Sequence, residues 1–146
     1  MAQVLRRAAV WAALLTLAVI GRNALDWWLA PTTEFYARSV VSTALAASIF
    51  AAAGLWAAAR SRSLRTGVGV GVATGVLAAV ALNLISMAML AVRHDPHTLA
   101  MIDASGGVGE VFLLPYIVLV PGTLCASAGA GLGRAIAWSL RSRVQQ

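Results

Sequence analysis

Four long apolar runs constrain the fold of this chain more than any other feature. They cover residues 8–21, 39–59, 66–92 and 111–133 and contain no charged side chain. A helix needs about 20 apolar residues to cross a hydrocarbon core roughly 30 Å thick, and the last three runs meet that length. The first run is shorter and needs residues 22–30 to complete a crossing. The pattern predicts helices at about 8–30, 35–59, 66–92 and 109–138.

Composition excludes a water-soluble fold. The chain is 60% hydrophobic and 11% charged, with a mean hydropathy of +0.83. Soluble proteins are roughly 45–50% apolar and about 25% charged. We therefore predict an all-α integral membrane protein with four antiparallel transmembrane helices that form a single domain over residues 1–146.

The N-terminus permits a rival interpretation as a secretory signal peptide, because Arg6 and Arg7 precede an apolar stretch of signal-like length. Cleavage requires small residues at alternate positions before the cut. Trp28 stands two residues before Ala30, so no such site follows the apolar stretch. We predict an uncleaved first helix.

The third run opens with TGVGVGVATGVLAAVALN, residues 66–83, in which glycine and valine alternate as in a strand. The run is longer than the usual strand of about 3–10 residues, and a lone strand in lipid leaves its backbone groups unpaired. It is therefore expected to be a helix. Small residues then recur once per turn, with a polar side chain one turn further: Gly67, Gly71, Gly75, Ala79 and Asn83.

Such a line of small residues lets another helix backbone approach closely. Three roles stay open for it: packing within the chain, an interface between subunits, or the lining of a pore. Val70 lies on another face, so leucine there is expected to be milder than leucine at Gly71 or Gly75. The fourth helix carries a similar line at Cys125, Gly129 and Gly133. Above that line, Pro115 and Pro121 each remove a helical hydrogen bond and predict a kink.

Charge distribution predicts the orientation. Eight arginines and no acid occupy the N-terminus, the middle loop and the C-terminal segment, whereas all five acids lie in the first and third connections. Short cytoplasmic loops carry the excess of arginine and lysine, so both termini are predicted to be cytoplasmic. The eight arginines are Arg6, Arg7, Arg60, Arg62, Arg65, Arg134, Arg141 and Arg143.

The net charge of +6 is explained by topology and by contact with anionic headgroups of the lipid bilayer, so no nucleic-acid partner is predicted. The chain contains arginine but no lysine, and alanine and glycine are abundant. This composition favours a bacterial source and, with it, the inner (plasma) membrane. On the outer side, Asp95 and Pro96 predict the start of a short surface helix at 96–104, before the fourth crossing.

Polar residues near the outer side are the candidates for chemistry, because charges at membrane depth are costly. Arg22 and Asp26 stand one helical turn apart and can pair. A four-helix bundle can bring them together with Asn83 and Glu110 as a polar or transport site; the alternatives are snorkelling or simple structural pairing.

No cofactor or metal is predicted. His94, His97 and Asp103 are only weak candidates for a metal site, since they match no known ligand spacing.

The leading functional hypothesis is a small membrane subunit or scaffold that associates through glycine-lined helix faces with itself or with a larger membrane protein. No enzymatic activity is inferred. The alternative is an oligomeric transporter or channel for an ion or small solute. A membrane enzyme with a site on the outer face is the third hypothesis.

Overall fold

The computed structural model describes residues 2–29, 35–92, 103 and 108–144, and these residues form helices and no strand. The expected all-α class is therefore confirmed. The segment predicted as a surface helix, 96–104, lies outside the described residues except for Asp103. The helices are α1 (Ala2–Leu29), α2 (Phe35–Ser61), α3 (Leu64–Val92), α5 (Val108–Ile117) and α6 (Leu119–Val144).

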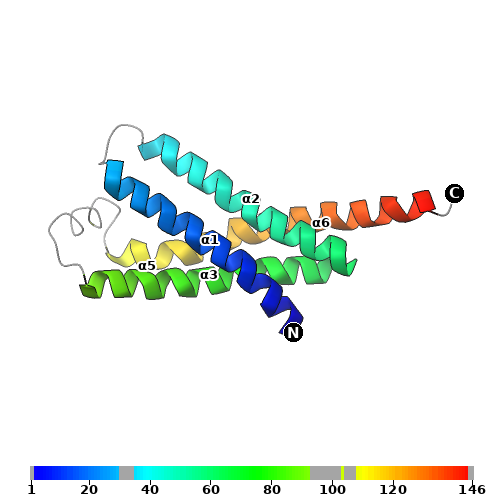
Figure 1. Ribbon diagram of the computed structural model, residues 1–146, viewed down its shortest axis with the longest axis horizontal. Coiled ribbons are helices and arrows are strands. Elements are labelled where there is room, and N and C mark those ends of the chain that lie inside the picture. The colour runs from blue at the N-terminus through cyan, green and yellow to red at the C-terminus, as the bar shows by residue number, and fades with distance from the viewer. Residues whose placement is uncertain (1, 30–34, 93–102, 104–107, 145–146) are drawn as a thin grey trace.

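Four helical segments are long and apolar enough to cross a membrane, as the apolar runs predict. They are Ala2–Arg22, Val40–Ser61, Leu64–Val92 and Pro115–Ser139. Figure 1 shows α1 and α3 running in one direction and α2, α5 and α6 returning in the other. We call the end where α1 begins and α2 meets α3 the basic end, because Arg6, Arg7, Arg60, Arg62 and Arg65 gather there.

Helix α2 packs most extensively on α6, and α3 lies against both. Helix α1 is peripheral, since among the described residues it contacts α2 and α3 but neither α5 nor α6. Helix α5 lies along α3 (Figure 1). The bundle therefore has a three-helix centre of α2, α3 and α6.

The turn between α2 and α3 is built by two residues. Arg62 adopts a left-handed backbone with φ of 56°, which reverses the chain after α2. Ser63 then caps α3, because its Oγ accepts a hydrogen bond from the backbone N–H of Thr66 at 3.3 Å. Its carbonyl accepts the N–H of Gly67 at 3.2 Å, which starts the helical ladder.

The predicted single fourth helix is two helices, with a break at Val118. Pro121 has no N–H to donate to the carbonyl of Ile117, and its ring crowds that carbonyl. The helix therefore ends at Ile117 and begins again at Leu119, where Pro121 falls in the first turn. The ladder resumes with the N–H of Gly122 bonded to the carbonyl of Val118 at 3.0 Å. On one side of the break α5 lies against α3, and on the other side α6 packs against both α2 and α3.

The core consists mainly of alanine. Phe50 is the largest fully buried side chain, and it packs in one cluster with Ala12, Leu15, Ala78 and Ala126. A second cluster joins α1, α2 and α3 through Ala8, Ala53, Ala57 and Val70. Such small side chains bring the helix axes close together, as is common in membrane bundles.

Hydroxyl groups within the helices bond to their own helix. The hydroxyls of Ser48, Ser61, Thr123 and Ser127 each donate to the carbonyl four residues earlier, at 2.7–2.8 Å. The hydroxyl groups are therefore hydrogen-bonded within their own helix and need no partner in the lipid. One hydroxyl instead bonds between helices, since Thr74 of α3 donates to the carbonyl of Ala8 on α1 over a long 3.5 Å.

Candidate functional site

Glycines of α2 and α6 bring the two backbones into contact. A Cβ atom added at Gly54 would collide with the carbonyl oxygen of Ala126 on α6. A Cβ at Gly129 would collide with the carbonyl oxygen of Ala51, and one at Gly133 with that of Leu55. We call this α2–α6 contact, together with the glycines of α3 that lie against it, the glycine seam.

The predicted line on α3 faces this contact. A Cβ at Gly67 would lie 2.6 Å from the Cβ of Ala130 and 2.8 Å from that of Ala58. A Cβ at Gly71 would collide with the Cβ of Ala126. One at Gly75 would collide with the tip of Leu119 and lie 3.2 Å from the ring of Phe50. Ala79, the next member of the line, is buried.

These glycines therefore lie against α2 and α6 of the same chain. Their contribution to stability and assembly stays a prediction, and variants described in the Discussion test it. Val70, where leucine is expected to be milder than at the glycines, is fully buried in the cluster that contains Ala8 of α1. Its variant is therefore not a neutral control, because α3 packs on α1 as well as on α2 and α6. The comparison with the glycines stays a prediction.

Sequence reasoning missed Gly54, Gly122 and Phe50. The ring of Phe50 fills the space above Gly122, where a Cβ would lie 2.7 Å from two ring carbons. A signal for Gly54 was present, since Gly54 and Ala58 form a small-residue pair one turn apart. It was hidden in a stretch where nearly every residue is small.

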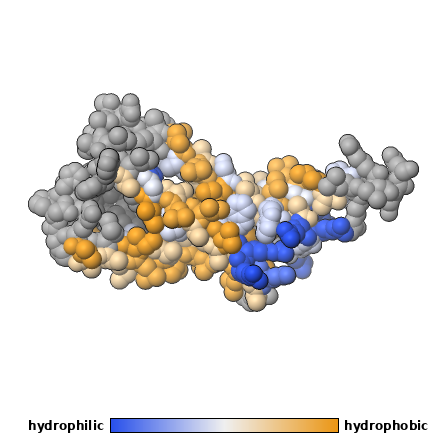
Figure 2. All heavy atoms as spheres, viewed as in Figure 1, coloured by the Kyte–Doolittle hydropathy of each residue, from blue (hydrophilic) through white to orange (hydrophobic). Residues whose placement is uncertain are grey.

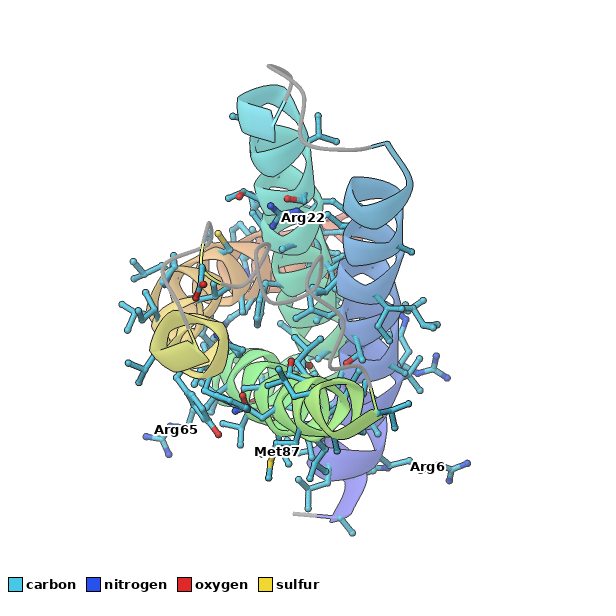
Figure 3. All side chains as sticks on the ribbon, turned by 90° about the vertical axis from the view of Figure 1, so that its left-hand side faces the viewer. Arg6, Arg22, Arg65 and Met87 are labelled. Carbon is cyan, nitrogen blue, oxygen red and sulfur yellow. The ribbon has the colours of Figure 1, made fainter. Side chains whose placement is uncertain are left out.

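The predicted polar site is described only in part. Arg22 is half-buried on the face of α1 that carries Ala8, Ala12 and Leu15. Figure 3 shows its side chain pointing from α1 toward α2. Asp26 belongs to α1 and Glu110 to α5, but both side chains lie outside the described residues, so the predicted convergence is not tested.

Oδ1 of Asn83, a predicted site residue on α3, is buried without a hydrogen-bond partner among the described residues. The same holds for Oγ1 of Thr16 on α1. Thr16 also borders an open groove of about 460 Å³ between α1 and α3. The groove is almost wholly apolar and is lined by Ala9, Ala12, Ala13, Thr16, Leu17, Leu77 and Ala81.

The weak metal candidates receive no structural support. His94 and His97 lie outside the described residues, and Asp103 is exposed. Within the part of the chain that the structure describes, no three His, Cys, Asp or Glu side chains form a group able to hold a metal ion.

An aromatic and basic cluster lies at the basic end. The rings of Trp11 on α1 and Trp56 on α2 meet edge to face, with centroids 6.5 Å apart and planes at 66°. The guanidinium carbons of Arg7 and Arg60 each lie 5.5 Å from the ring centroid of Trp56. Sequence reasoning could not pair the two tryptophans, since the pairing depends on how α1 packs on α2.

Comparison of the chain with protein-family models, with curated proteins and with solved structures finds no match.

Proposed function

We propose that this chain is a small integral membrane subunit or scaffold, without enzymatic activity of its own, that associates with a second copy or with a larger membrane protein. The glycine seam is the observation that carries the proposal. Between α2, α3 and α6 a single added methyl group meets backbone or side-chain atoms at Gly54, Gly71 and Gly129. Such a contact leaves no path for a solute between these helices and suits a structural role.

The proposal places both termini in the cytoplasm of a bacterial cell, with the protein in the inner membrane. Its support is the collection of arginines at one end of the bundle. Figure 2 shows hydrophilic side chains gathered toward the basic end, whereas apolar side chains cover most of the other described surface in that view. Positively charged segments stay on the cytoplasmic side.

Reporter fusions test this orientation. A reporter that is active only outside the cytoplasm gives signal when fused after Gly107 and none when fused after Arg62. The reverse pattern contradicts the orientation and every assignment of sides that depends on it.

Association is tested by purification in mild detergent, with the mass of the particle determined. The seam glycines contact the chain's own helices, whereas Gly131 on α6 and Gly21 on α1 have nothing within 4 Å. Leucine substituted at either position therefore alters an outer face without filling the seam. We expect a particle heavier than one chain, and a lower mass in whichever variant alters the associating face. A parent particle of one chain with nothing bound contradicts the proposal.

A transporter or channel is the second candidate, favoured by the unpartnered Oδ1 of Asn83 and Oγ1 of Thr16 at membrane depth. The break at Val118 also resembles the interrupted helices of transporter sites. The variant Asn83→Leu separates the two functions. A scaffold keeps its assembly and stability, because the variant removes a buried amide oxygen that has no hydrogen-bond partner among the described residues. In a transporter, proton or potassium flux into reconstituted vesicles, present in the parent, is lost in this variant.

A further inference from the structure

Two arginines from different helices meet on one indole ring at the basic end. Arg7 comes from α1 and Arg60 from α2, and both guanidinium carbons lie 5.5 Å from the ring centroid of Trp56. They are therefore separated by no more than twice that distance. Trp11, one turn from Arg7, supports the Trp56 ring from the side. The cluster is thus a built feature of the α1–α2 contact.

The two positive charges have no acidic counterpart nearby in the sequence. Residues 1–25, 35–94 and 111–146 contain neither Asp nor Glu. Cation–π attraction holds each guanidinium over the ring, but it does not neutralise the repulsion between the two charges. The counter-charge must come from an anion outside these segments.

The position of the cluster indicates which anion that is. Arg7 lies near the start of the apolar span Ala2–Arg22, and Arg60 near the end of Val40–Ser61. Tryptophan and arginine at the ends of membrane spans lie at the level of the lipid headgroups. Anionic lipids present their phosphates at this level.

We propose that Arg7 and Arg60, held over Trp56, form a binding site for the phosphate of an anionic phospholipid headgroup. Cation–π attraction at 5.5 Å uses the charge of each guanidinium and not its N–H donors, so a phosphate oxygen can accept hydrogen bonds from them. This inference goes beyond the proposed scaffold function, because it assigns a specific lipid site to the fold.

The test uses the whole chain in neutral phosphatidylcholine nanodiscs, with phosphatidylglycerol titrated in and bound lipid counted by native mass spectrometry. The double variant Arg7→Gln, Arg60→Gln is compared with Arg6→Gln, Arg65→Gln. The second pair removes the same charge from the same end, and Figure 3 shows its two side chains pointing outward on opposite sides. Loss of a hydrogen bond between charged groups weakens binding by about tenfold, so the first double variant is expected to bind phosphatidylglycerol roughly 100-fold more weakly.

The control pair is expected to lose at most about 25-fold, because it lowers only the general surface potential, by about fivefold for each arginine. Equal weakening in both double variants means diffuse attraction and overturns the site. Excess inorganic phosphate distinguishes the source of the anion: if it displaces phosphatidylglycerol, the site is one for free phosphate and the lipid assignment fails. If the first double variant does not fold, Arg60→Gln is compared with Arg65→Gln, since Arg60 is exposed. A loss of about tenfold that exceeds the loss in Arg65→Gln supports the site, and equal losses overturn it.

Discussion

The contact of α2 with α6 differs from that of α1 with α3. At the first contact, carbonyl oxygens of Ala51, Leu55 and Ala126 approach glycine backbones so closely that a methyl group has no room. At the second, a Cβ at Gly69 would meet Val4 at an ordinary 3.9 Å, the interhelical hydrogen bond is long, and an open groove remains. The comparison predicts that the α2–α6 contact fixes the bundle, whereas the α1–α3 contact tolerates more change.

The largest expected effect comes from adding one methyl group to the seam. Gly129→Ala forces the α2 and α6 backbones apart and should cost about 3 kcal/mol of stability, or prevent folding. Gly131→Ala, two residues along the same helix, meets nothing within 4 Å and should be neutral or stabilising by up to about 1 kcal/mol. Thermal melting in one detergent measures both. Equal melting temperatures would remove the distinction between the two contacts.

Truncation of Phe50 should have the next largest effect. Its ring is 2% exposed and fills the space beside Gly75 and Gly122. Phe50→Ala leaves a cavity and is expected to cost about 2–4 kcal/mol, somewhat less than in water, because lipid solvates apolar groups as well as a core does. Leu17→Ala at the α1–α3 groove is the control. Leu17 is 64% exposed, so its variant should melt within a few degrees of the parent. A larger loss for Leu17→Ala would show that α1 is fixed as firmly as α6.

A smaller effect is expected at the hydrogen bond between α3 and α1. Thr74→Val keeps the shape of the side chain and removes the 3.5 Å bond to the carbonyl of Ala8. Interhelical hydrogen bonds in membranes contribute about 0.6 kcal/mol on average, and this long bond should contribute no more. A loss above about 2 kcal/mol in denaturant titration would mean that the α1–α3 contact depends on a stronger bond than its geometry indicates.

A comparably small effect, but of opposite sign, is expected in the turn. Arg62 has φ of 56°, a conformation that costs a side-chain-bearing residue about 1–2 kcal/mol and glycine much less. Glycine also loses more entropy on folding, so Arg62→Gly should stabilise the protein by less than about 1 kcal/mol. Arg62→Ala, which removes the same charge but keeps the left-handed strain, is the control. Destabilisation by glycine alone would show that the turn needs a stiff residue.

Much of the helical architecture was predictable from the sequence. Apolar runs longer than any strand predict helices, and α3 is a helix throughout residues 66–83 despite its alternating glycines. The apolar runs predict which segments cross the membrane, but they do not predict how far each helix extends beyond the apolar segment. Helix α1 therefore starts at Ala2, before the first apolar run, and α6 continues to Val144, beyond the last.

Contacts between helices were less predictable, since they depend on which faces meet. The periodic glycines on α3 suggested close packing, but nothing in the spacing shows that Gly71 lies against Ala126 or that Arg7 reaches Trp56. The break at Val118 was signalled by Pro115 and Pro121. Its position is set by Pro121, which has no N–H to donate to the carbonyl of Ile117.

The central claim is that the glycine seam joins helices of one chain, and Gly75→Ala tests it most directly. The added Cβ meets the flexible tip of Leu119 and the Phe50 ring, which can move slightly, so this variant should still fold. Particle mass and melting temperature are measured on the same mild-detergent samples of parent and variant. The account predicts a lower melting temperature with an unchanged mass. A mass that falls to that of one chain, with the melting temperature of the remaining monomer unchanged, would contradict it and place the seam between subunits.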